Sequence, residues 1–160
     1  LAQAIAGNPR LIIVDEPTAG LDPEERLRFY RLLAELAADR IVLLSTHIVE
    51  DVAVLCARFA VIRNGKLIAV TEPQAARAAI EGTIFEATVS AAELDELRLT
   101  RCVTQALLVE GRNRVRIFDP GRNGPPGFAP VAPTLEDTYL VMMRNGATGE
   151  ARNSEFEIET

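Results

Sequence analysis

The sequence predicts an α/β fold: part of a parallel sheet layer, followed by a small α+β domain. Two short aliphatic runs, residues 11–14 and 41–44, lie on either side of a helix-length segment, and this strand–helix–strand order is typical of a parallel crossover. From residue 83 onward apolar and polar residues alternate, as they do in strands with one buried face. The 160 residues, 48% hydrophobic, suffice for one good core or for part of a larger domain plus a small one.

The first two predicted strands contain only aliphatic residues. Residues 11–14 and 41–44 do not alternate with polar residues, so we expect both strands to be buried on both faces, as in the middle of a parallel sheet. A helix over residues 1–6, ended by Gly7-Asn8-Pro9, should precede them. The crossover between the strands should be right-handed, which brings their carboxyl ends to the same edge of the sheet.

The helix between these strands has a well-specified start. Asp22 can act as its N-cap, Pro23 suits the first helical position, and Glu25 lies three residues after the cap, as in a capping box. The pattern predicts a helix over residues 23–38. Its apolar face is expected to carry Leu27, Tyr30, Leu33 and Leu36.

The next elements complete a first predicted domain over residues 1–82. Asn64-Gly65 between two apolar runs indicates a tight hairpin, because both residues tolerate positive φ. Gly82 ends the last helix of the domain. The predicted elements are a helix over 48–57, hairpin strands over 59–63 and 66–70, and a helix over 73–80.

The rest of the chain is predicted to form a β-α-β-β-α accessory domain over residues 83–144 and a disordered tail over 145–160. The segment 119–133 is rich in Gly and Pro and is expected to be an irregular loop. Thr134, with Asp137 three residues later, should cap a final helix that ends at Arg144. The remaining predicted elements are strands over 83–89, 103–109 and 114–118 and a helix over 92–97.

Composition excludes several classes of protein. A formal charge of -6 and a pI near 4.9 argue against nucleic-acid binding, which needs clustered Lys and Arg. The sequence has neither an apolar run of the roughly 20 residues that cross a membrane nor a signal segment at its start. Cys56 and Cys102 lie in apolar stretches without metal-ligand spacing, so we expect buried, reduced thiols; a disulfide between them is the alternative.

Polar residues follow each aliphatic strand at its carboxyl end. Asp15-Glu16 follows the first strand and Ser45-Thr46-His47 follows the second. Ligands of open parallel sheets bind just past the carboxyl ends of the strands, so these side chains are expected to form a site.

Three motifs in order, LIIVDEP at 11–17, AGLDP at 19–23 and STH at 45–47, resemble the Walker B strand, D-loop and H-loop of the nucleotide-binding subunits of ATP-binding cassette (ABC) transporters. Each motif is weak alone, but the three together, joined by the right helix and strand, are specific. The resemblance covers residues 1 to about 70 and implies the C-terminal part of a P-loop NTPase-like sheet layer. The region 83–144 is less specific; its PTLEDTYL segment is similar to the usual end of exporter-type subunits.

The resemblance implies a role for each polar residue. Asp15 would hold Mg²⁺ through its water shell, and Glu16 would act as general base toward the attacking water. His47 would contact the γ-phosphate of ATP and link it to Glu16. Asp22, with Gly20 and Leu21, would form the D-loop at the interface with a second ATPase subunit of the same or a different kind. Two neighbouring acids could serve separate roles because adjacent strand residues point to opposite sides.

The resemblance also lacks parts of the family pattern. No GxxxxGK[ST] phosphate loop, Q-loop or LSGGQ-type signature occurs in these residues, and residues 1–7 resemble the helix that follows a signature, so we expect the chain to begin just after one. By itself the chain should bind ATP weakly or not at all. The implied protein is a cytoplasmic ATPase subunit, peripheral at the membrane through a transmembrane permease, with no nucleic-acid partner. The alternatives are a soluble ABC ATPase that acts outside transport and a non-catalytic regulatory module.

Overall fold

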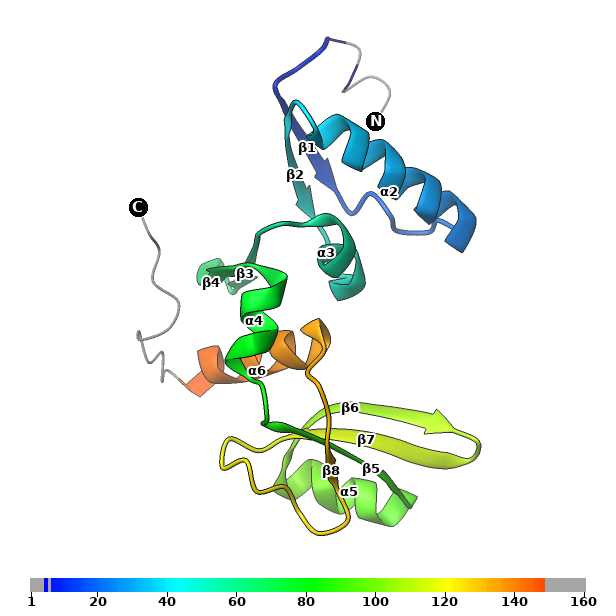
Figure 1. Cartoon of the computed structure of the whole chain (residues 1–160), viewed down its shortest axis with the longest axis vertical. Coiled ribbons are helices and arrows are strands. Elements are labelled where there is room, and N and C mark those ends of the chain that lie inside the picture. The colour runs from blue at the N-terminus through cyan, green and yellow to red at the C-terminus, as the bar shows by residue number, and fades with distance from the viewer. Residues whose placement is uncertain (1–4, 6, 149–160) are drawn as a thin grey trace. The chain divides into compact units, whose positions relative to one another are not determined.

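The computed structural model describes residue 5 and residues 7–148 (Figure 1). The chain divides after Cys56 into two compact units. The predicted domain boundary at residue 82 falls inside the second unit and stays a prediction. Of the predicted first helix only Ile5 lies among the described residues.

The first unit contains a parallel strand pair. Its elements are β1 (Leu11–Asp15), α2 (Pro23–Ala37), β2 (Ile41–Ser45) and α3 (Val49–Leu55). The strands pair in register from Leu11 opposite Ile41 to Asp15 opposite Ser45, and their arrows run in the same direction in Figure 1. The parallel pairing and the mixed α/β character are therefore confirmed.

Helix α2 begins as its sequence indicates. The Asp22 side chain accepts a hydrogen bond from the backbone N–H of Glu25 at 2.8 Å. The Glu25 side chain accepts one from the backbone N–H of Asp22 at 3.3 Å, which completes the capping box. The predicted apolar face is wrong at Leu27, whose side chain is 58% exposed. The buried stripe instead joins Phe29, Leu33 and Leu36. This i, i+4, i+7 spacing keeps side chains on one helix face, and Leu27 lies off it.

The sheet of the first unit is covered on one face only. Ile12 is 2% exposed and packs against Leu33 and Leu36 of α2. The alternate side chains are largely exposed, so the predicted burial of both faces is wrong for the described residues. Neighbouring strand residues point to opposite faces, and α2 lies on one of them. The exposed set is Leu11, Ile13, Ile41 and Leu43.

The second unit begins with a hairpin and a helix. Strands β3 (Phe59–Arg63) and β4 (Lys66–Thr71) pair antiparallel, with a bulge between Val61 and Ile62. Asn64 and Gly65 have φ values of 50° and 71°, as the two central residues of a type I′ turn require. The hairpin prediction is confirmed, and α4 (Pro73–Ala79) follows it.

A four-stranded antiparallel sheet forms the rest of the second unit. Its strand order is β6-β7-β5-β8. β8 arises inside the segment expected to be irregular, where residues 129 and 130 pair with β5. α6 runs past the predicted end at Arg144, because one glycine costs a helix only about 1 kcal/mol. Residues 149–160 of the predicted tail lie outside the described residues. The elements are β5 (Ile84–Val89), α5 (Ala91–Thr100), β6 (Cys102–Val109), β7 (Arg112–Phe118), β8 (Ala129–Pro130) and α6 (Leu135–Thr148).

Neighbouring residues of β5 enter two different cores. Phe85 packs with Leu94, Val115 and Ile117, whereas Ile84 packs with Ile80 and Val141. The loop before β8 approaches the core around Phe85 so closely that a Cβ at Gly124 would lie 2.5 Å from the Phe85 ring. Gly124 also has a φ of 56°. Glycine is therefore required at this position.

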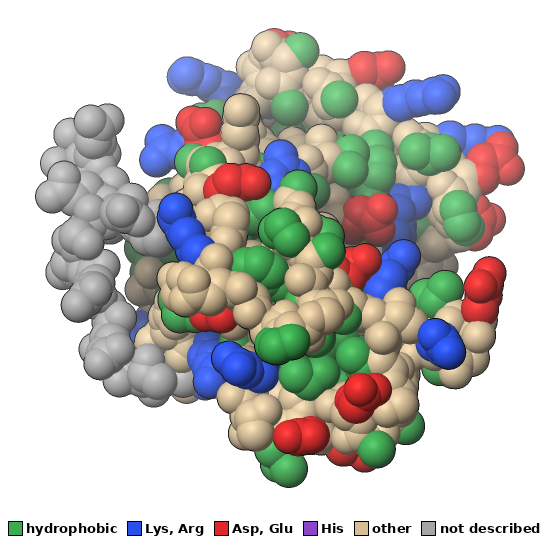
Figure 2. Space-filling model, turned by 60° about the horizontal axis from the view of Figure 1, so that its bottom comes forward, with side chains coloured by type: hydrophobic (Ala, Val, Ile, Leu, Met, Phe, Trp, Pro, Cys, Tyr) green, Lys and Arg blue, Asp and Glu red, His purple; other side chains and the backbone are tan. Residues whose placement is uncertain are grey.

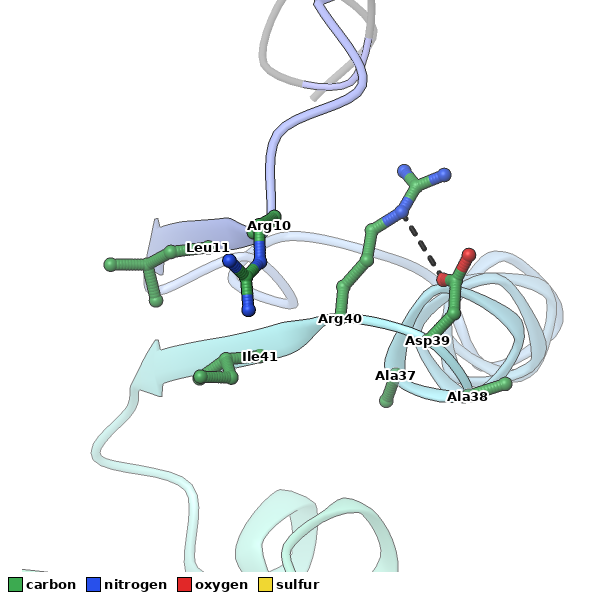
Figure 3. Close-up of a pocket in the computed structure, with 7 residues that line it drawn as sticks. All are labelled: Arg10, Leu11, Ala37, Ala38, Asp39, Arg40 and Ile41. Carbon is green, nitrogen blue, oxygen red and sulfur yellow. Dashed lines mark ion pairs between the residues drawn. The ribbon is translucent and has the colours of Figure 1, made fainter.

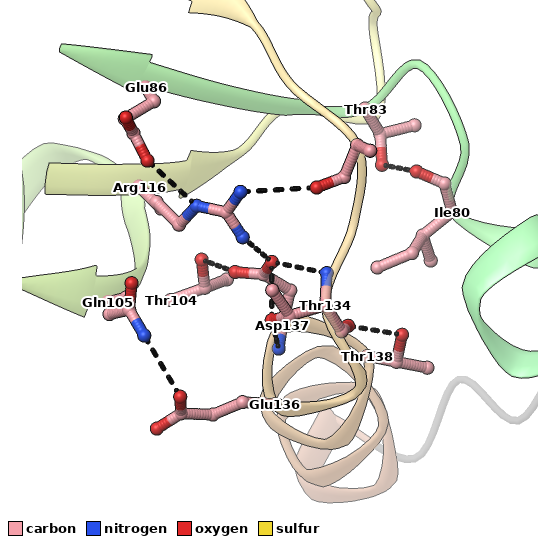
Figure 4. A network of polar contacts seen from close by, with 11 residues as sticks. Ile80, Thr83, Glu86, Thr104, Gln105, Arg116, Thr134, Glu136, Asp137 and Thr138 are labelled. Atoms are coloured by element: carbon pink, nitrogen blue, oxygen red, sulfur yellow. Dashed lines mark hydrogen bonds and ion pairs between the residues drawn. The ribbon is translucent and has the colours of Figure 1, made fainter. Parts of the chain in front are cut away.

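A buried ion pair fixes α6 to the sheet (Figure 4). The carboxylate of Asp137, which is 1% exposed, accepts hydrogen bonds from Nη1 of Arg116 at 2.5 Å, from the hydroxyl of Thr104 at 2.5 Å and from the backbone N–H of Thr134 at 2.9 Å. Thr134 accepts a hydrogen bond from the N–H of Asp137 in return, so the predicted cap is confirmed. Arg116 also contacts Glu86 at 3.0 Å.

Cys56 and Cys102 are free thiols, so the reduced state is confirmed and no disulfide joins them; the expectation that they are buried is wrong, because both are half-buried. Within residues 5 and 7–148, none of the helices has the length and hydrophobicity needed to cross a membrane. On the face shown in Figure 2, Lys and Arg side chains are scattered among acidic and apolar ones, without a continuous basic patch.

Candidate functional site

The carboxyl ends of β1 and β2 bring the predicted site residues to one edge of the sheet. Asp15 and Ser45 are the last residues of the two strands and lie opposite each other in register. The Ser45 hydroxyl donates a hydrogen bond to Oδ1 of Asp15. Both residues are exposed, so the Asp15 carboxylate is open to ligands.

Glu16 leaves the strand conformation. Its φ is 45°, in the left-handed region that few residues other than Gly, Asn and Asp adopt. Its backbone N–H still donates to the carbonyl oxygen of Ser45 at 2.9 Å. Asp15 and Glu16 are therefore separated by a backbone turn, and the expectation that strand alternation separates them is wrong. A left-handed glutamate directly after a strand is a backbone outlier of the kind that collects at functional sites.

The structure brings Glu16 and His47 together. Nδ1 of His47 lies 2.7 Å from Oε2 of Glu16, although the residues are 31 positions apart in the chain. The side chain of His47 is 75% exposed and that of Glu16 is 35% exposed. An ionised carboxylate can only accept hydrogen bonds, so Nδ1 carries the proton in this contact.

Asp22, Gly20 and Leu21 lie in the turn that leads into α2. Gly20 has a φ of 78°, and the N–H of Leu21 donates to the carbonyl oxygen of Thr18 at 3.2 Å. The carboxylate of Asp22 caps the helix, as described above. The capping role is thus established by geometry, and a role at a subunit interface stays a prediction.

Sequence reasoning missed Asp51, a buried acid behind the site. Asp51 is fully buried at the start of α3 and accepts hydrogen bonds from the hydroxyls of Thr18 and Tyr30. Burial, with a further contribution from the Asp51 hydrogen bond, raises the pKa of Tyr30 to about 12. Burial, followed by the charge of Asp51, also raises the pKa of the Cys56 thiol. Thr18, which donates to Asp51, lies 33 residues away from it in the chain, so no local sequence pattern could have identified the pair.

An open depression of about 600 Å³ lies at the other end of the strands (Figure 3). Its lining includes Arg10 and Leu11 at the start of β1 and Ile41 at the start of β2. Asp39 and Arg40 form an ion pair of 3.2 Å at its rim. The candidate site lies at the carboxyl ends of the strands, so this depression is separate from it.

The donor set at the carboxyl edge suits a cation that keeps most of its water. Among residues 5 and 7–148, no three His, Cys, Asp or Glu side chains cluster to hold a metal ion. Mg²⁺ commonly binds through one or two carboxylates, water and phosphate oxygens, and the exposed Asp15 carboxylate fits that pattern.

Comparison with known proteins points to one family. No family model matches the chain. The chain is 47% identical over 64 residues to human ATP-binding cassette sub-family A member 9, a match that covers 40% of this chain and 4% of that protein. It is 46% identical over 76 residues to Nod factor export ATP-binding protein I of Rhizobium johnstonii and 45% identical over 76 residues to the protein of that name in Mesorhizobium japonicum. These two matches cover 47% of this chain and 24% and 22% of the relatives.

The matched part thus spans a quarter or less of the length of these relatives. The relatives are ATP-binding proteins, and the Walker B-like, D-loop-like and H-loop-like motifs had indicated the same family. About half of this chain is similar in sequence to ABC ATP-binding proteins.

Proposed function

We propose that this chain is part of the ATP-hydrolysing subunit of an ABC transporter, which drives a substrate across a membrane through a separate transmembrane partner. The observation that carries the proposal is the 2.7 Å contact between Glu16 and His47, next to the open carboxylate of Asp15. Phosphoryl transfer needs neutralised phosphate charge and a positioned water, and these three side chains are suited to that work. The similarity to proteins named as ATP-binding supports it.

In this mechanism the two neighbouring acids act separately. Asp15 would hold Mg²⁺ through its water ligands; when bound, the ion neutralises charge on the phosphates of ATP. Glu16 would accept a proton from the water that attacks the γ-phosphate. The turn at Glu16 directs its carboxylate to His47, while Asp15 stays paired with Ser45.

His47 would then bridge two hydrogen-bond acceptors. Its Nδ1–H is directed to the carboxylate of Glu16. A bond from Nε2 to a phosphate oxygen needs a second N–H, because an anionic oxygen can only accept.

The partners follow from the same proposal. The turn of Gly20, Leu21 and Asp22 would face a second ATPase subunit, and a transmembrane permease would hold the subunit at the cytoplasmic face of the membrane. Nod factor export ATP-binding protein I is named for export. We extend the export direction, but not its substrate, to this chain.

The test compares Glu16→Gln with Glu24→Gln in the complete subunit. Glu24 is an exposed acid that pairs with Arg28 on α2, so it controls for the loss of one negative charge. Glu16→Gln should leave Mg-ATP binding unchanged and lower turnover by about 10²-fold or more, because general-base catalysis contributes that much. Glu24→Gln should leave both unchanged. Turnover and nucleotide binding are measured separately, by phosphate release and by equilibrium binding.

Unchanged turnover in Glu16→Gln would rule out the general-base role. Full ATP turnover that does not respond to any membrane partner would instead support a soluble ABC ATPase.

A further inference from the structure

Asp51 is a fully buried carboxylate that three hydroxyl groups surround. Thr18 donates to Oδ2, Tyr30 donates to Oδ1 at 2.5 Å, and Thr46 lies at 3.5 Å from Oδ2. Among the described residues Asp51 has no ion-pair partner. A buried carboxylate without a cation is stabilised by hydroxyl donors directed at its oxygens, so this cluster is built around one acid.

The three donors come from different segments, and two of those segments carry predicted catalytic residues. Thr18 is fully buried in the loop that follows Glu16. Thr46 directly precedes His47, and its hydroxyl also accepts the N–H of Ile48 at 3.0 Å. The carboxylate of Asp51 thus connects the Glu16 loop to the His47 segment on the buried side.

The contact between Glu16 and His47 needs such support. The side chain of His47 is 75% exposed, and an exposed ion pair contributes little to stability because water screens it. Glu16 also has an unfavourable backbone conformation, with a φ of 45°. A weak contact cannot by itself hold a strained loop in place. The positions of Glu16 and His47 therefore need support from buried contacts.

We propose that Asp51 is a positioning residue of the site: through Thr18 and Thr46 it holds the Glu16 loop against the His47 segment. The proposal rests on the ATPase function proposed above. In that function the carboxylate of Asp51 contacts neither nucleotide nor water and acts only through the geometry of Glu16 and His47.

The experiment uses Asp51→Asn and Thr18→Val in the complete subunit. Thr18→Val removes one donor to the buried acid with little change in shape, and Thr18→Ser restores the hydroxyl. Thr104→Val is the matched control, because Thr104 also donates to a buried acid, Asp137, 33 residues away in the second unit.

Two quantities are measured. The first is amide hydrogen exchange in residues 17–21 and 45–48. It should rise about tenfold in Asp51→Asn and Thr18→Val, in line with the loss of a hydrogen bond to a charged group. The second is ATP turnover. In both variants kcat should fall roughly 10- to 100-fold while the KM for Mg-ATP changes little, because misplaced catalytic groups slow chemistry.

Thr18→Ser should recover most of the kcat, and Thr104→Val should leave the kcat and the exchange of both segments unchanged. If residues 17–21 and 45–48 exchange amide hydrogens at the wild-type rate in both Asp51→Asn and Thr18→Val, the positioning role is overturned. Equal losses of kcat in Thr18→Val and Thr104→Val would also overturn it. A wild-type subunit without ATP turnover would refute the proposed function, and the exchange result alone would then decide the role of Asp51.

Discussion

Replacing Asp137 by Asn should be among the most destabilising single changes in the second unit. Asp137 is 1% exposed and Arg116 is 11% exposed, so the pair is shielded from water. Removing one partner of a buried ion pair costs about 3–5 kcal/mol. Arg116 keeps its contacts with Glu86 and with the carbonyl oxygen of Ala132, and Asn can still accept the N–H of Thr134. We therefore expect a loss at the lower end, about 3 kcal/mol of the free energy of unfolding.

Glu86→Gln provides the comparison within the same network. Glu86 contacts the same Arg116 at 3.0 Å, but its side chain is 28% exposed. Water screens this pair more strongly, so the change should cost about 1 kcal/mol or less. The two carboxylates differ in burial, and Asp137 also accepts hydrogen bonds from Thr104 and Thr134.

Urea unfolding followed by tyrosine fluorescence measures both changes. The chain has two tyrosines and no tryptophan, and Tyr139 lies in α6, two residues after Asp137. In a Tyr30→Phe background Tyr139 is the only tyrosine and reports on the second unit. The urea midpoint should shift without a change in the slope m. Equal losses for Asp137→Asn and Glu86→Gln would refute the reasoning that burial sets the strength of this ion pair.

Three further predictions concern the first unit. Folding raises the pKa of Tyr30 to about 12, so above about pH 10 the tyrosine ionises more readily in the unfolded chain than in the folded one. The free energy of unfolding should therefore fall between about pH 10 and pH 12. Urea midpoints measured against pH should show this fall, and Tyr30→Phe should flatten it. Burial and the charge of Asp51 raise the pKa of the Cys56 thiol, so iodoacetamide should label Cys56 slowly at mildly alkaline pH. Mass spectrometry should show faster labelling in Asp51→Asn than in the wild type. At the N-cap of α2, Asp22→Ala should cost about 1 kcal/mol and Asp22→Asn much less; equal melting curves would contradict the capping role.

Local signals explain most of the agreement between sequence and structure. The cap at Asp22, the turn at Asn64-Gly65 and the cap at Thr134 each depend on residues within four positions of one another. Such features are set by the backbone preferences of the residues themselves. The parallel pair and the convergence of Glu16 with His47 also followed, because the order of strand, helix and strand restricts how the chain can connect.

The sequence by itself determined most element types, their caps and turns, and the motifs that resemble those of ABC ATP-binding proteins. Only the tertiary structure decided which face of the β1–β2 pair is covered, since an aliphatic strand reads the same whether one face or both are buried. It also decided that Glu16 turns out of the strand and that Asp51 lies beneath the site. The hydrogen bonds of Asp51 join residues 33 and 21 positions apart, and contacts at that separation form only when the chain packs.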